Sequence, residues 1–187
     1  RVALEEALRR AELQVEEFER LLHARRTQSP AALASVPVIT RSAGGVADTL
    51  TLAIGGVAGV TVQMPATTGA GLVGLVTDVT GRTAVVRTLL DPRSRVGVTV
   101  RGKGGQGVAV GDVDGRVRVD RFVTEEPIAV GDVVETSAVG GLFPRGLRVG
   151  VVVEVLPQDP NELRRSFLVM PAVDLATTLD VVLIAPP

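Results

Sequence analysis

The sequence predicts a mainly β protein, with an N-terminal coiled-coil helix followed by two small β-barrel domains. Residues 1–28 contain no Gly or Pro and place apolar residues at helical spacing. The remainder consists of short Val- and Thr-rich runs, most of them closed by Gly, Asp or Pro. Apolar residues make up 45% of the chain but aromatic residues only 2%, so the core must be built from Val, Leu, Ile and Ala, which favours strands.

The segment 1–28 is predicted to form a helix that ends at Ser29-Pro30. Its apolar residues are spaced as positions a and d of three heptads, which predicts pairing with another helix; the alternative is packing on the chain's own β domain. The acidic e positions Glu5, Glu12 and Glu19 would repel each other across an antiparallel pair, so a parallel dimer is favoured. The predicted dimerisation seam is Leu4, Leu8, Ala11, Val15, Phe18 and Leu22.

The β part is predicted to contain two domains after a linker at 29–37. The change in character near Asp91-Pro92-Arg93 predicts a first barrel over 38–92, completed by 166–187, and a second barrel over 93–165. The predicted strands are 49–54, 59–64, 72–79, 83–90, 96–101, 107–113, 115–123, 132–137 and 149–156.

The charge and the metal-ligating residues exclude several function classes. With 20 basic and 21 acidic residues the net charge is −1, so no nucleic-acid footprint is predicted. The chain has no Cys and one His, which leaves only carboxylates as metal ligands. Asp112 with Asp114, and Glu125 with Glu126, are interpreted as turn or solvated residues. We therefore predict no metal and no cofactor.

Two glycine-rich segments match phosphate-binding patterns only superficially. Gly69 to Gly74 reads GAGLVG, but strand pattern follows it, whereas a dinucleotide site requires a helix there. Gly102 to Gly107 reads GKGGQG, but no Lys-Ser or Lys-Thr follows its last glycine. The first is interpreted as a turn with a strand, and the second as a hairpin tip.

Ser137, in the segment GDVVETSAVGGLFPRGLRVG at 131–150, raises the question of nucleophilic catalysis. A catalytic serine requires a base, and the only histidine, His23, falls at a solvent-facing heptad b position of the predicted helix. Lys103 lies in a glycine-rich tip, where the desolvation that would lower its pKa is not expected. The sequence therefore favours a segment whose shape is recognised by other groups, rather than a catalytic centre.

The same segment resembles the signature of the bacterial rod-shape protein family MreC. That signature has a Gly-Asp, a strand, Thr-Ser-Gly, a Gly pair, Phe-Pro and Gly-Leu-x-x-Gly in this order; Ala138 departs from it. GLVGLVTDVTGRTAVVRTLLDPRSRVGVTV and PAVDLATTLDVVLI are also similar to strands of that family. The signature residues, which are also the candidate interaction surface, are Gly131, Asp132, Thr136, Ser137, Gly140, Gly141, Phe143, Pro144, Gly146 and Gly150. Phe143 is the first candidate for a binding or self-assembly contact, because an aromatic residue on a glycine-flanked loop suits a hot spot; the alternative is that its ring fills its own barrel.

The resemblance implies a non-enzymatic scaffold of the cell-elongation machinery that organises peptidoglycan synthesis and rod shape. It implies an inner-membrane protein with one N-terminal span, absent from this chain, and with this region in the periplasm. The implied partners are a second copy or higher self-assembly, MreD, the actin-like MreB through the membrane assembly, and the penicillin-binding transpeptidase that works with RodA. Because the chain begins at Arg1 without Met, we expect that it is part of a longer protein.

Two other classes share parts of this pattern. A periplasmic adaptor of an export pump also joins a coiled coil to a β-barrel, but it requires a helical hairpin with two long arms, and one arm is predicted here. A double-barrel serine hydrolase would have to use Ser137 with the remote His23.

Overall fold

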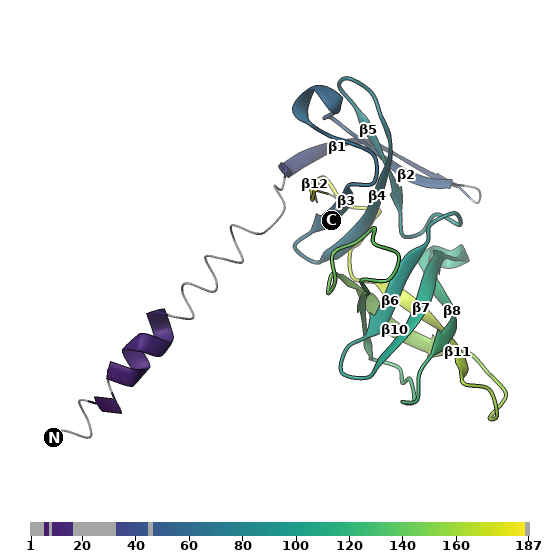
Figure 1. The fold of residues 1–187 in the computed structure, drawn as a ribbon. Helices are drawn as coiled ribbons and strands as arrows, with labels where there is room; N and C mark the ends of the chain where they lie inside the picture. The colour runs from purple at the N-terminus through teal and green to yellow at the C-terminus, as the bar shows by residue number, and fades with distance from the viewer. Residues whose placement is uncertain (1–5, 8, 17–32, 45–46, 186–187) are drawn as a thin grey trace. The chain divides into compact units, whose positions relative to one another are not determined.

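The computed structural model describes residues 6–7, 9–16, 33–44 and 47–185 (Figure 1). The chain divides into two compact units, residues 1–32 and 33–187. Within the first unit, 6–7 and 9–16 are helical and exposed. No helix in these ranges is long and apolar enough to cross a membrane.

The predicted coiled coil over 1–28 is described only in part. Ala11 and Val15 of the seam lie on the exposed helical residues, and the Val15 side chain is 58% exposed. Dimerisation through this helix therefore stays a prediction. The other seam residues and the histidine lie outside the described residues: Leu4, Leu8, Phe18, Leu22 and His23.

The second unit contains twelve described strands, which form two closed barrels of six strands each, as the sequence predicts. All the pairings are antiparallel. The first barrel has the order β1 (Leu33–Gly44), β12 (Asp180–Leu183), β3 (Pro65–Thr68), β4 (Gly71–Val79), β5 (Ala84–Thr88) and β2 (Ala47–Leu52). The second has the order β10 (Arg148–Val155), β11 (Arg164–Pro171), β8 (Val117–Val123), β7 (Gly104–Gly111), β6 (Val96–Val100) and β9 (Val133–Thr136). Two short 3-10 helices, η1 (Gly56–Ala58) and η2 (Val113–Gly115), lie in connections.

Strand pairing places the domain limits differently from the sequence interpretation. β1 begins at Leu33, inside the predicted linker 29–37, because Val36 is buried and pairs with Val181 of β12. β11 lies wholly in the second barrel, so the predicted limit at residue 165 is corrected to the end of this strand. β12 then returns to the first barrel, and the chain crosses between the barrels twice.

One predicted strand is wrong. Residues 59–64 form turns between η1 and β3, although GVTVQM has the composition of a strand. Gly59 has φ 93° and Gln63 has φ 69°, and neither value is compatible with a continuous strand. Val60 and Met64 are nevertheless buried and belong to the hydrophobic cluster.

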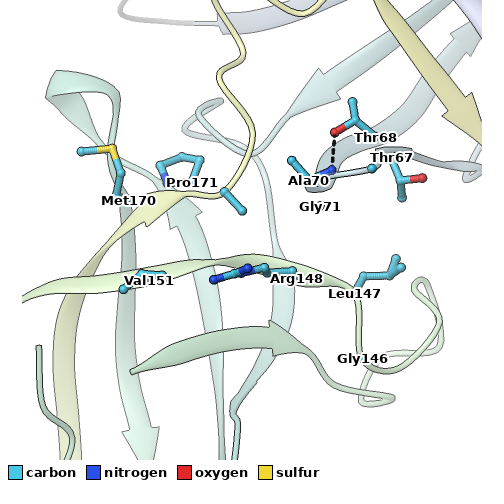
Figure 2. A pocket seen from close by; sticks show the side chains of 12 residues that line it. Thr67, Thr68, Ala70, Gly71, Gly146, Leu147, Arg148, Val151, Met170 and Pro171 are labelled. Carbon is cyan, nitrogen blue, oxygen red and sulfur yellow. Dashed lines mark hydrogen bonds between the residues drawn. The ribbon is translucent and has the colours of Figure 1, made fainter. Parts of the chain in front are cut away.

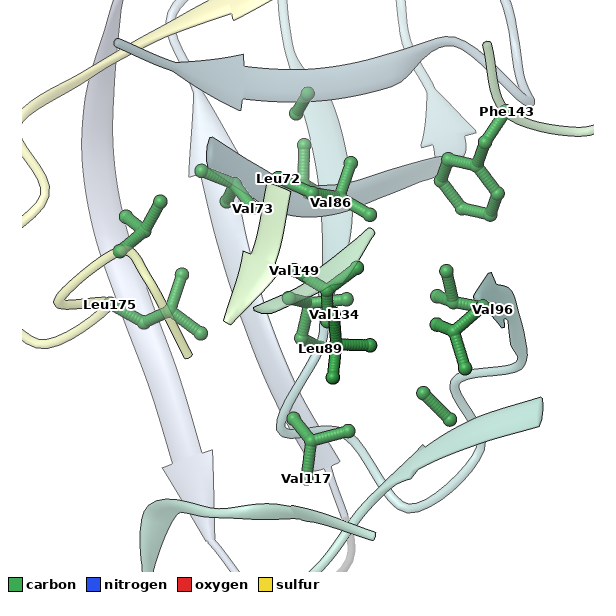
Figure 3. Packing of buried hydrophobic residues seen from close by; sticks show 14 of the residues in the cluster. Leu72, Val73, Val86, Leu89, Val96, Val117, Val134, Phe143, Val149 and Leu175 are labelled. Atoms are coloured by element: carbon green, nitrogen blue, oxygen red, sulfur yellow. The ribbon is translucent and has the colours of Figure 1, made fainter. Parts of the chain in front are cut away.

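The core is aliphatic, as the composition predicts. Buried and partly exposed residues alternate along β2, β5 and β6, which places one face of each strand inside a barrel. Buried residues of both barrels belong to one continuous hydrophobic cluster, part of which is drawn in Figure 3. Its one aromatic pair, Phe122 with Phe167, has ring centroids 5.3 Å apart in an edge-to-face arrangement.

Candidate functional site

The signature segment 131–150 consists of β9, a loop and the start of β10, and Thr136 holds the loop closed. The Thr136 N–H donates to the Leu147 carbonyl at 2.8 Å, and the Gly146 N–H donates to the Thr136 carbonyl at 3.0 Å. The Thr136 Oγ1 donates to the Pro144 carbonyl at 2.6 Å and accepts from the Leu147 N–H at 2.9 Å. Since Thr136 is fully buried, these bonds are protected from water and fix the loop on its own barrel.

The loop turns at Gly140 and Gly141, which have φ values of 92° and 66° that favour glycine. After this turn Phe143 enters the hydrophobic core and is only 6% exposed (Figure 3). The prediction that Phe143 is offered to a partner is therefore corrected: its ring is buried in the hydrophobic cluster. The physical reason is the bond between Thr136 and the Pro144 carbonyl, which turns the chain back towards the core.

Ser137 is buried, and its Oγ has no hydrogen-bond partner among the described residues. A Cβ added at Gly97 would lie 2.9 Å from this Oγ and 2.7 Å from the Val139 carbonyl oxygen. The serine side chain therefore packs directly against Gly97, where a larger residue would clash. The Lys103 Nζ donates to Asp132 at 2.7 Å and to the Pro127 carbonyl at 2.8 Å. Among the residues that the structure describes, Ser137 therefore has no base to accept its proton.

Replacing Ser137 with alanine is expected to leave the free energy of unfolding unchanged or to raise it by up to about 1 kcal/mol, because the change removes a buried hydroxyl that makes no hydrogen bond. Thr136→Val, at the adjacent position, removes a hydroxyl that makes two hydrogen bonds and is expected to lower it by about 2 kcal/mol. Urea denaturation of the two variants beside the wild type measures both effects. A loss of more than about 1 kcal/mol in Ser137→Ala would show that the serine hydroxyl is engaged.

Asp132 ties the signature segment to the β6–β7 hairpin. Its Oδ2 accepts from the Ala129 N–H at 2.9 Å and from the Lys103 Nζ. Burial alone would raise the pKa of Asp132, but the Ala129 N–H and the charged, hydrogen-bonded Lys103 lower the pKa below its ordinary value. The glycine-rich tip is therefore anchored to the turn before β9 through the chain's only lysine.

Asp91, in the link 89–95 between β5 and β6, has a structural role that the sequence interpretation missed. It is fully buried, and its Oδ2 accepts from the Asp48 N–H at 3.0 Å. Its carboxylate also accepts from the Arg93 N–H at 2.8 Å and from the Arg93 guanidinium at 3.0 and 3.1 Å. The Asp48 carboxylate in turn accepts from Thr88 at 2.6 Å and from Arg41 at 2.8 Å. The link is thus bonded to Asp48 of β2, which in turn bonds to β5 and β1 of the first barrel.

The same link also contacts the second barrel. A Cβ added at Gly111 of β7 would lie 2.3 Å from the Leu90 carbonyl group and 2.5 Å from the Asp91 carbonyl oxygen, so glycine lets the two backbones meet there. Burial would raise the pKa of Asp91, but the hydrogen bonds from Arg93 and Asp48 and the charge of Arg93 outweigh it and lower the pKa to about 2. Asp91 is therefore an ionised, buried residue at the junction of the barrels.

A groove of about 560 Å³ also lies between the barrels. The β3–β4 turn forms one wall, and the start of β10 together with the end of β11 forms the other. Figure 2 shows Thr67 to Gly71 on one side, Met170 and Pro171 on the other, and Arg148 on β10 between them. The two barrels touch beside it, since a Cβ added at Gly71 would lie 2.4 Å from the Arg148 carbonyl oxygen.

No group of three or more His, Cys, Asp or Glu side chains in residues 6–7, 9–16, 33–44 and 47–185 could hold a metal ion. The Thr136 and Asp132 bonds hold the second barrel together, the Asp91 and Asp48 bonds hold the link to the first barrel, and close backbone packing at Gly71 and Gly111 joins the two barrels. The arrangement defines a protein of two closed antiparallel β-barrels that pack against each other.

A family model described as "Rod shape-determining protein MreC, barrel core" matches residues 38–185. The chain therefore belongs to the MreC family, whose proteins determine cell shape, as the signature segment predicts.

Individual relatives agree with this assignment. The cell shape-determining protein MreC of Caulobacter vibrioides is 34% identical over 131 residues, which are 70% of this chain and 38% of that protein. The MreC crystal structure from Pseudomonas aeruginosa has a TM-score of 0.75 and 27% identity, covering 83% of this chain and 99% of the other. A complex of a penicillin-binding protein (PBP2) and MreC from Helicobacter pylori matches with a TM-score of 0.63 over 82% of this chain and 98% of the other; at 16% identity it shows the fold alone. This chain thus spans well under two thirds of the curated relative's length.

Proposed function

We propose that this chain is the extracytoplasmic, periplasmic region of a single-pass inner-membrane scaffold that organises peptidoglycan synthesis in the cell-elongation machinery. The observation that carries the proposal is the match of the MreC barrel core to residues 38–185, over a fold of two closed barrels. In this role the barrels present surfaces to enzymes that perform the chemistry, and the chain itself performs none.

The proposed partner with the most direct support is a penicillin-binding transpeptidase that works with RodA. A related double-barrel protein forms a complex with a penicillin-binding protein in Helicobacter pylori. MreD, and MreB through the membrane assembly, are the further proposed partners, and their support is membership of the family alone.

The environment of Ser137 supports the non-enzymatic part of the proposal. Its hydroxyl is buried against Gly97, and no histidine lies within the described residues. Lys103 is bonded to Asp132 and Pro127 and does not reach it as a base. No observation favours the hydrolase or the export-pump adaptor as a second candidate function.

Isothermal titration of this chain against the extracytoplasmic region of the penicillin-binding transpeptidase from the same organism tests the proposed partnership. The proposal predicts saturable binding with a defined stoichiometry. Absence of binding, with both proteins folded by circular dichroism, would remove this transpeptidase as a partner.

Self-association through the helix has its own test. We expect the chain to approach twice its mass of 19.4 kDa in sedimentation equilibrium, and a shortened chain that begins at Pro30 to sediment as a monomer. Interference optics are required because the chain has no Trp or Tyr. The shortened chain keeps β1, which begins at Leu33, so its barrels remain complete. Monomers in both cases would remove the parallel dimer from the proposal.

A further inference from the structure

The groove between the barrels is built from both domains, so it exists only while they hold their positions. Its first wall is the turn from Thr67 to Gly71 in the first barrel. Its second wall, in the second barrel, combines the start of β10 with Met170 and Pro171 at the end of β11. The close contact of Gly71 with the Arg148 carbonyl fixes the distance between the walls. The volume of about 560 Å³ lies within the usual range of ligand clefts.

The groove combines an apolar wall with a single positive charge. Met170 is 48% exposed, and it is the cross-strand neighbour of Val151. Arg148 is the only ionisable side chain that lines the groove, and it has no ion pair among the described residues. Its cross-strand neighbour Glu135 is engaged with Arg101 at 2.9 Å. The Arg148 charge is therefore available to a partner.

The rest of the lining adds little that selects for a polar or cationic ligand. The Thr68 hydroxyl already accepts from the Ala70 N–H at 3.2 Å, which stabilises the turn. Gly69 and Gly146 leave main chain at the surface without side chains to obstruct it. The lining contains no carboxylate, so a basic ligand would meet only repulsion from Arg148.

We propose that this groove binds an extended apolar segment with a carboxylate side chain, supplied by the penicillin-binding partner; the inference rests on the proposed function. The carboxylate pairs with the Arg148 guanidinium, which suits bidentate contacts. Apolar side chains of the segment pack on Met170, whose flexible thioether adapts to their shape. Because both barrels form the groove, the partner recognises their relative placement as well as their residues.

Biolayer interferometry with the immobilised extracytoplasmic region of the transpeptidase and the 187-residue chain tests this assignment. Arg148→Glu and Met170→Asp are each expected to weaken binding about tenfold or more. Arg82→Glu makes the same charge change at an exposed position in the β4–β5 turn, at the other end of β4 from the groove, and is expected to stay within about twofold of the wild type. Circular dichroism and urea denaturation establish that each variant is folded.

Photo-crosslinking from p-benzoylphenylalanine placed at Ala70 identifies the segment. Mass spectrometry is expected to find one stretch of the transpeptidase that contains an Asp or Glu beside apolar residues. Crosslinks that map only to basic or uncharged stretches would overturn the chemistry assigned to the ligand. If the wild type and all three variants bound equally well, the groove would not be the binding site, and the proposed function would stand. If the wild type did not bind, both the groove and the proposed partnership would be rejected.

Discussion

Replacing Asp91 with alanine is expected to lower the free energy of unfolding by about 3 kcal/mol, as for other buried ionic networks that lose one partner. The carboxylate is fully buried, and it accepts hydrogen bonds from the Asp48 N–H and from the main chain and guanidinium of Arg93. Its removal leaves the Asp48 N–H without an acceptor and loosens the link that packs on Gly111.

Urea denaturation followed by far-ultraviolet circular dichroism measures this loss, and Asp120→Ala is the matched control. Asp120 also pairs with an arginine, Arg118 at 2.9 Å, but both side chains are about half exposed, so its loss is expected to cost less than about 1 kcal/mol. Similar effects at the two positions would contradict the structural role of Asp91.

The dependence of stability on pH provides a second readout of Asp91. Its pKa is about 2 in the folded chain against an ordinary value of 3.8, so the folded state favours the ionised form. The resulting stabilisation, about 2 kcal/mol, is present above about pH 4 and is lost as the pH falls through about 2. Asp91→Asn removes the titrating carboxylate and with it this stabilisation. The difference in free energy of unfolding between the wild type and the variant is therefore expected to shrink as the pH falls from 4 to 2. An advantage that stays constant over this range would show that the pKa of Asp91 is not lowered.

Phe143→Ala is expected to lower the free energy of unfolding by about 3 kcal/mol, because it leaves a large cavity in the hydrophobic cluster. Phe143→Leu keeps most of the volume and is expected to cost about 1 kcal/mol. Val139→Ala, in the same loop but at a side chain 55% exposed, controls for changes in the loop itself and is expected to cost less than about 0.5 kcal/mol. Thermal and urea unfolding measure all three.

Partner binding distinguishes the buried position of Phe143 from a surface role. Because the ring points into the core, folded Phe143→Leu is expected to bind the transpeptidase as the wild type does. If Phe143→Ala kept its free energy of unfolding but lost binding to the transpeptidase, the result would show that the ring contacts the partner and is not part of the core.

The barrels were predictable because their strands follow local rules. Alternating burial and Val-rich composition mark β2, β5 and β6, and the composition correctly indicates an aliphatic core. The errors occur where tertiary contacts override composition. Residues 59–64 look like a strand but turn at Gln63, and β1 begins within the predicted linker because β12, far along the chain, pairs with it.

The candidate site was less predictable, because its contacts join distant residues. Asp48 and Asp91 are 43 positions apart, and no local pattern connects them. Phe143 sits on a glycine-flanked loop that resembles an exposed turn, and its burial depends on the hydrogen bonds by which Thr136 closes that loop. The groove at Arg148 is formed by segments of both barrels, so it carries no motif of its own.

We propose that this protein acts by binding through its barrels and that Ser137 performs no chemistry. The most direct test is cell shape, in the source cells depleted of their own copy and supplied with variants of the full-length protein that contains this chain. We expect rods with Ser137→Ala, as with the wild type, and rounded cells with Arg148→Glu combined with Met170→Asp, at equal protein levels. Rounded cells with Ser137→Ala, while that variant accumulates normally, would contradict it.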